Sequence, residues 1–209
     1  MTALGGIRTL SVCSLALSLL LTAACTGSSP SQQSQGLPPD CTQTITRSDD
    51  VRDALNATAP GSTVCFTGGD LTDADLAMTK SGTPTSPIKL IADGAPVENI
   101  HVTANHVVVE GFTVAGGDGI ELEGTGITAQ HNTIHDTRRG GIACTPCSDS
   151  TIASNTVRHV ATVGVFISGQ RITVTGNTVS ETVAEDDGDA DGMRFFGTGH
   201  RITGNTIRD

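Results

Sequence analysis

The chain has 209 residues, of which 36% are hydrophobic, and a formal net charge of −10 at pH 7. Its 22 acidic residues outnumber the 12 basic ones, which argues against nucleic acid as a partner and disfavours polyanions unless cations bridge them. The chain lacks Trp and Tyr and has only 5 Phe, so side chains that could stack on sugar rings are scarce. Nothing in the sequence suggests a nucleotide, haem or flavin site.

The N-terminal residues have the features of an export signal. Arg8 precedes an apolar stretch over residues 10–21, which is short for a membrane span and typical of the hydrophobic part of a signal peptide. The stretch ends in Leu-Thr-Ala-Ala-Cys, which resembles a bacterial lipobox and implies lipidation of Cys25. Thr22 stands where that motif usually has Leu, so a plain secretory signal cut near Ala24 stays open.

We therefore expect a signal peptide over residues 1–24 and a protein that is anchored to the cell membrane or released outside the cell. Residues 25–40 are rich in Ser, Gln, Gly and Pro, a composition that predicts a flexible tether. Four cysteines lie beyond Cys25, and an even number in an exported chain predicts two disulfides. The expected pairs are Cys41 with Cys65, closing the start of the fold, and Cys144 with Cys147, clamping a local loop.

Residues 41–87 are expected to form a cap that contains one short helix. Ser48 is a candidate N-cap, and two aspartates in the first turn follow it. Val51, Ala54 and Leu55 follow helical spacing, and an Ala-Pro-Gly run at 59–61 ends the pattern. Such an amphipathic helix would plug one opening of the fold that follows.

The rest of the chain, residues 88–209, carries a repeat marked by the tripeptide Asn-Thr-Ile or Asn-Thr-Val. The tripeptide begins at Asn132, Asn155, Asn177 and Asn205, which are 23, 22 and 28 residues apart. Each is preceded by a glycine and a short alternating run, which is typical of strands. This period predicts an all-β chain with a single-stranded parallel β-helix of roughly five turns. The repeated asparagine is expected to form a stacked ladder at a bend.

Residues at equivalent positions of the repeat should stack into columns inside the coil, because one turn alone cannot bury its apolar side chains. Three columns are expected, and their members are Ile134, Val157, Val179 and Ile207; Ile120, Ile142, Val165 and Met193; and Ile127, Ile152, Ile172 and Ile202.

Three segments, at residues 54–65, 80–83 and 87–92, resemble exported right-handed β-helix proteins of the pectin-lyase-like superfamily. The chain is most similar to the branch of chondroitinase- and alginate-lyase-like proteins. This resemblance implies a right-handed coil and a place among polysaccharide lyases, hydrolases, uronate epimerases and members without catalysis. The motif sets of the polygalacturonases and of the alginate-lyase branch are missing, with only an echo at Gly199-His200-Arg201, so no catalytic residue carries over.

The longest interval of the repeat holds an acidic insertion over residues 185–192. Its alternating carboxylates before a glycine match the first half of a calcium loop. The expected Ca²⁺ ligands are Asp186, Asp187, Asp189 and Asp191. Thr198 stands where an EF-hand has its last glutamate, so Asp118 or Glu121 from another turn would complete the shell. A solvated acidic loop is the alternative.

Two sets of residues are candidates for catalysis. Arg194 follows the acidic insertion and would act as a base, while calcium neutralises a substrate carboxylate. The alternative is an arginine that simply pairs with the aspartates. Aligning the repeats also brings Arg158 and His159 near Asp136 and Glu181, a mixture that holds a base, an acid and a charge stabiliser. Solvated turn residues would look the same.

Arg138 and Arg139 are candidates for binding a substrate carboxylate, and Phe166 and Phe196 are the outward aromatic residues that could contact a sugar. Two functional hypotheses follow. One is a calcium-dependent polyuronate lyase or epimerase that acts on extracellular polysaccharide, and the other is a non-catalytic surface lipoprotein that binds glycan or protein or is structural. We expect a monomer. The sequence stops two residues after the fourth repeat, which suggests a truncated remnant or a covered coil end.

Overall fold

The computed structural model describes residues 38, 40–183 and 190–208, and these belong to one compact unit. These described residues form one helix, α1 (Ser48–Asn56), and eighteen strands. The strands are β1 (Gln43–Arg47), β2 (Thr63–Asp70), β3 (Asp75–Met78), β4 (Ile88–Ala92), β5 (Pro96–Thr103), β6 (Val107–Glu110), β7 (Thr113–Thr125), β8 (Thr128–Gln130), β9 (Thr133–Thr137), β10 (Ile142–Ser148), β11 (Thr151–Ala153), β12 (Thr156–Val160), β13 (Val163–Gln170), β14 (Thr173–Thr175), β15 (Thr178–Thr182), β16 (Asp191–Thr198), β17 (Arg201–Thr203) and β18 (Thr206–Arg208).

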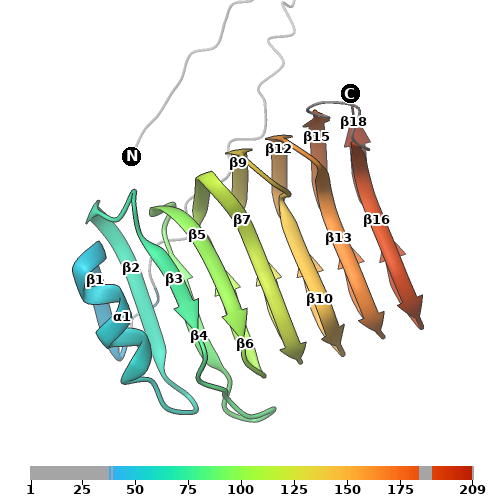
Figure 1. Cartoon of the computed structure of the whole chain (residues 1–209). Helices are drawn as coiled ribbons and strands as arrows, with labels where there is room; N and C mark the ends of the chain where they lie inside the picture. Colours follow the sequence, from blue (N-terminus) through green and yellow to red (C-terminus); the bar gives the residue numbers. More distant parts are fainter. Residues whose placement is uncertain (1–37, 39, 184–189, 209) are drawn as a thin grey trace, which may run out of the picture. The chain divides into compact units, whose positions relative to one another are not determined.

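The strands wind into a parallel coil, as Figure 1 shows. One sheet has the order β1-β2-β4-β6-β8-β11-β14-β17, and the other has the order β16-β13-β10-β7-β9-β12-β15-β18. Each strand pairs with its equivalent one turn later, which confirms the predicted solenoid. The coil has about six turns. The roughly five turns expected from Ile88 onward agree with this, because the additional turn lies before Ile88, where β2 and β3 pair in register with β4 and β5.

The long strand β7 joins two groups of strands in the ten-stranded sheet, and these form two different sides of the coil. Residues Thr113 to Ala115 of β7 pair with β9, whereas Ile120 to Thr125 pair with β10. One side therefore consists of β9, β12, β15, β18 and the first residues of β5 and β7. The other consists of β3, the later parts of β5 and β7, β10, β13 and β16, and we call it the front side (Figure 1).

Two of the three predicted interior columns are confirmed by the strand register. Val157 pairs with Ile134 and Val179, and Ile142 pairs with Ile120 and Val165. The third column was wrong, because Ile152 pairs with Ala129 and Val174 and not with Ile127 or Ile172. All of these residues are buried, so the core contains two neighbouring columns where the sequence predicted one.

The predicted asparagine ladder is confirmed. The side-chain amide N–H of Asn132 donates a hydrogen bond of 3.0 Å to Oδ1 of Asn155. The amide N–H of Asn155 donates one of 2.9 Å to Oδ1 of Asn177, and that of Asn177 donates one of 2.9 Å to Oδ1 of Asn205. Each receiving oxygen also accepts the backbone N–H of the preceding asparagine, and three of the four residues are buried. The ladder therefore satisfies polar groups at one corner of the four turns that carry these asparagines.

Helix α1 covers the start of the coil and buries Val51, Ala54 and Leu55, as predicted. Ser48 is not the N-cap; Arg47 occupies that position in an extended conformation, and its side chain makes no capping hydrogen bond. Both predicted disulfides are present, Cys41–Cys65 and Cys144–Cys147. Within the described part of the chain, no helix has the length and hydrophobicity required to cross a bilayer.

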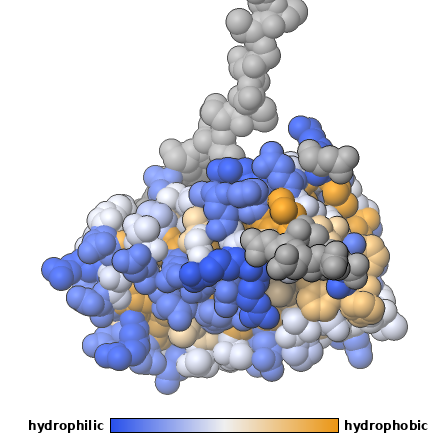
Figure 2. Space-filling model, turned by 45° about the horizontal axis from the view of Figure 1, so that its top comes forward, coloured by the Kyte–Doolittle hydropathy of each residue, from blue (hydrophilic) through white to orange (hydrophobic). Residues whose placement is uncertain are grey.

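The last turn of the coil exposes apolar side chains. Phe195 is 51% exposed and Ile207 is 56% exposed, although their partners in the preceding turn, Ile167 and Val179, are buried. Figure 2 shows hydrophobic residues gathered toward the side of the molecule where this turn lies. Hydrophilic residues dominate the rest of that view.

Candidate functional site

Outward-facing residues of the front side align into rows, because neighbouring turns of a parallel coil lie about 4.8 Å apart in register. The first row crosses five turns, and its members are His101, Glu121, Ala143, Phe166 and Arg194. Two residues further along each strand, a second row contains Thr103, Glu123, Ser168 and Phe196. The front side thus brings polar and aromatic side chains from different repeats together.

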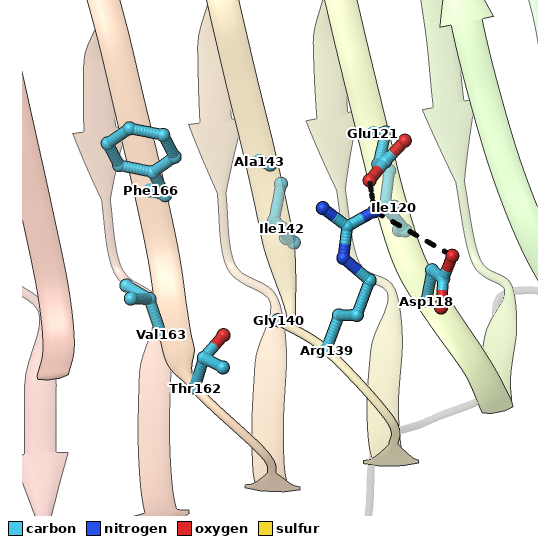
Figure 3. Close-up of a pocket in the computed structure, with 10 residues that line it drawn as sticks. All are labelled: Asp118, Ile120, Glu121, Arg139, Gly140, Ile142, Ala143, Thr162, Val163 and Phe166. Carbon is cyan, nitrogen blue, oxygen red and sulfur yellow. Dashed lines mark hydrogen bonds and ion pairs between the residues drawn. The ribbon is translucent and has the colours of Figure 1, made fainter. Parts of the chain in front are cut away.

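The first row contains a cleft at its centre, shown in Figure 3. Ala143 has the smallest side chain in the row and lies between Glu121 and Phe166. The cleft has a volume of about 120 Å³ and is lined by Asp118, Ile120, Glu121, Arg139, Gly140, Ile142, Ala143, Thr162, Val163 and Phe166. A charged pair therefore stands at one side of the cleft and an aromatic ring at the other (Figure 3).

Glu121 is the centre of the charge network around the cleft. Its Oε1 accepts a hydrogen bond of 3.0 Å from Nη1 of Arg139, and its Oε2 lies 3.1 Å from Nδ1 of His101. Arg139 also lies 3.8 Å from Oδ2 of Asp118, and His101 lies 3.6 Å from Asp75. Arg139 is 64% exposed, so these pairs contribute little to stability but leave donors and acceptors available at the surface.

The predicted substrate-binding residues divide into two groups. Arg139 and Phe166 line the cleft. Arg138 does not line it and donates a hydrogen bond of 2.9 Å to Glu98. Phe196 is 57% exposed and meets Phe166 edge to face, with ring centroids 6.0 Å apart. The two aromatic residues singled out in the sequence are therefore neighbours on the front side.

The acidic insertion is only partly within the described residues. Asp186, Asp187 and Asp189 lie outside them, so their predicted role as calcium ligands is untested. Asp191 begins β16, and its Oδ2 accepts a hydrogen bond of 2.5 Å from Nε of Arg194. The other proposed ligands, Asp118 and Glu121, face Arg139. Over residues 40–183 and 190–208, no group of three or more His, Cys, Asp or Glu side chains is arranged to hold a metal.

Arg158 and His159 lie on β12, on a different side of the coil from the cleft. His159 donates from Nδ1 to Oδ1 of Asp136, and His135 Nδ1 lies 2.6 Å from the second oxygen of the same carboxylate. The hydrogen bond from His159, followed by that from His135, lowers the pKa of Asp136 to about 2. The predicted alignment of Asp136 with His159 is therefore matched by a contact.

His101 and Ala143 belong to the row around the cleft but are not among the residues predicted from the sequence. Glu121, Ala143, Phe166 and Arg194 each stand two residues after a glycine that begins the strand pattern. That common spacing could have placed them in one row. The pairing of Arg139 with Glu121 depends on how a turn folds back over the previous strand, which the spacing does not reveal.

The fold can be compared with known proteins. A family description, right handed beta helix region, matches residues 92–209. Among solved structures, an alginate lyase from Paenibacillus sp. str. FPU-7 is similar at 13% identity and a TM-score of 0.32, over 80% of this chain and 96% of that chain. No curated protein matches. The family match covers more than half of the sequence, and the chain therefore belongs to the right-handed β-helix family.

Proposed function

We propose that the protein binds polysaccharide on its front side and that the cleft above Ala143 holds one sugar ring. The observation that carries this proposal is the position of Phe166 opposite the Glu121–Arg139 pair across a small side chain. An aromatic face offers an apolar surface to the C–H groups of a sugar. The carboxylate and guanidinium supply acceptors and donors for its hydroxyl groups.

The charge of the site favours neutral sugars over uronates. Asp118 and Glu121 place two carboxylates beside one arginine at the cleft, in a chain whose net charge is −10. A substrate carboxylate would have to displace one of them or be bridged by a cation, because like charges at this range repel.

The experiment that tests this proposal is a screen of neutral and acidic oligosaccharides with the wild type and with Phe166→Ala and Arg139→Gln. Loss of the ring or of the guanidinium should weaken binding by about tenfold or more. Thr203→Ala, an exposed residue in the other sheet, is the matched control and should bind as the wild type does. Equal binding by Phe166→Ala and the wild type would refute the site.

The proposal includes export, with a lipid on Cys25 as the anchor. The two disulfides support an oxidising compartment, because such bonds persist mainly outside the cytosol. Mass analysis of the mature N-terminus tests this part. A diacylglycerol on Cys25 would establish the anchor, whereas an unmodified end at the same place would indicate plain secretion.

A calcium-dependent polyuronate lyase or epimerase is the second candidate. It is favoured by one observation: Arg194 stands in the same outward row as Phe166 and Glu121. A basic group in that row could take a proton from a uronate bound along the front side, while calcium at the acidic insertion neutralises its carboxylate. Arg158 and His159 belong to another side of the coil, which makes them useful controls.

A further inference from the structure

Strand β10 changes register beside the cleft. Cys144 pairs with Leu122 of β7 and with Ile167 of β13, whereas Cys147 pairs with Gly124 and Gly169. Between these two pairs, β10 advances by three residues while each neighbouring strand advances by two. This is a β-bulge, a device that re-aims side chains near functional sites.

The bulge carries two consecutive exposed residues and is closed by a disulfide at its base. Cys144 and Cys147 both point inward and are buried, with their Cα atoms 5.5 Å apart. Thr145 and Pro146 between them are both exposed. A regular strand would turn one of the two inward, so the bulge leaves both side chains standing on the front side. We call Thr145 and Pro146 the ridge.

The ridge lies next to the cleft. Ala143, which lines the cleft, comes one residue before Cys144 on the same strand. The ridge occupies the β10 position of the second outward row, between Glu123 of β7 and Ser168 of β13. Arg139 and Thr162 line the cleft from the turns before β10 and β13. A chain of sugars that follows the first row is thus bordered by the ridge on one flank and by these turn residues on the other.

We propose that the ridge is a specificity wall, which admits an unbranched glycan and rejects one with a side branch on the sugar held above Ala143. This inference rests on the proposed function. A branch pointing toward the second row would meet Thr145 and Pro146, and the covalent link beneath them prevents the bulge from flattening. Pro146 has no N–H to offer a branch in compensation.

The test compares pairs of oligosaccharides that share one backbone and differ by a single-sugar branch. Binding is measured with the mature full-length chain by calorimetry. The wild type should bind each unbranched member about tenfold more tightly than its branched partner. The double variant Thr145→Gly with Pro146→Gly keeps both cysteines and should bind the two members within about twofold. The variant Thr203→Gly in the other sheet serves as the control and should discriminate as the wild type does.

A second variant, Cys144→Ala with Cys147→Ala, keeps the ridge residues but frees the bulge, and it should also lose discrimination while circular dichroism reports a folded coil. Equal wild-type affinity for both members of each pair, or full discrimination by the glycine variant, would overturn the inference. Failure of the proposed function looks different, because Phe166→Ala would then bind as the wild type does. Absence of binding to every oligosaccharide would overturn both.

Discussion

The side-chain amide of Asn155 donates a hydrogen bond of 2.9 Å to Oδ1 of Asn177, the equivalent residue one turn further along the coil. The same amide donates 3.0 Å to the carbonyl of Ala129, and the oxygen of Asn155 accepts from Asn132. Asn155→Ala would leave several buried polar groups without partners. We expect a loss of about 3 kcal/mol in the free energy of unfolding, measured by urea denaturation.

The control for this prediction is Asn105→Ala. The Asn105 side chain accepts one exposed hydrogen bond, from the backbone N–H of Thr125. Its removal should cost about 1 kcal/mol or less. Comparable losses for the two variants would mean that the buried ladder contributes no more than a surface contact.

The hydrogen bonds from His159 and His135 to Asp136 predict a pH dependence of stability. They lower the pKa of Asp136 from 3.8 to about 2, so the folded state favours the carboxylate. The contribution is complete above the unfolded value of 3.8 and is lost as the pH falls through the folded value of about 2. Asp136→Asn should therefore be less stable than the wild type at about pH 5, and the difference should disappear as the pH falls below about 2. A difference that stays constant across this range would contradict the assignment.

Gly169 is predicted to be intolerant of any side chain. Its φ is +143°, and a β-carbon there would lie 1.8 Å from the carbonyl oxygen of Cys147, at the end of the bulge. Gly169→Ala should lower the stability by about 3 kcal/mol or more, because either β10 or β13 must move. Gly176→Ala is the matched control, since its φ is also positive at +66° but the nearest atom is 3.5 Å away. It should cost about 1 kcal/mol.

Calcium binding at the acidic insertion is testable by calorimetry and by thermal shifts with and without chelator. We expect micromolar binding by the wild type and none by Asp189→Ala, because the alternating carboxylates repel unless a cation lies between them. Asp93→Ala removes an exposed carboxylate elsewhere and should bind normally. Identical heats for the wild type and Asp189→Ala would remove calcium from the proposal.

If the lyase hypothesis holds, cleavage of uronate polymers should create unsaturated ends that are detected by absorbance. Arg194→Ala should lower the rate by about a hundredfold or more, since it removes the proposed base. The double variant Arg158→Ala with His159→Ala changes a different side of the coil and should keep its activity. Cleavage that survives Arg194→Ala combined with Asp189→Ala would rule out this mechanism.

The asparagines allowed much of the coil to be predicted, because positions close to them in each repeat keep a fixed register. Val157 stacks on Ile134 and Val179 for this reason. The prediction of the third column failed because side chains point inward both three and five residues before the asparagine. Ile152 holds one and Ile172 the other, and hydrophobicity alone does not distinguish them.

The cleft was harder to predict than the core. Phe166 and Arg139 were singled out by residue type, but Ala143 is an unremarkable strand residue in the sequence. Its importance comes from being smaller than its neighbours Glu121 and Phe166 in the adjacent turns. A cleft of this kind is formed by three neighbouring strands together, so it cannot be predicted from the sequence of any one of them.

The asparagine ladder spans intervals of 23, 22 and 28 residues with hydrogen bonds of 3.0, 2.9 and 2.9 Å. The spacing of the turns at that corner is therefore independent of how much chain each turn contains. Extra residues between two of these asparagines therefore do not shift the strands above or below. Such a scaffold can accept an insertion in one turn at a time while the stacked framework stays unchanged.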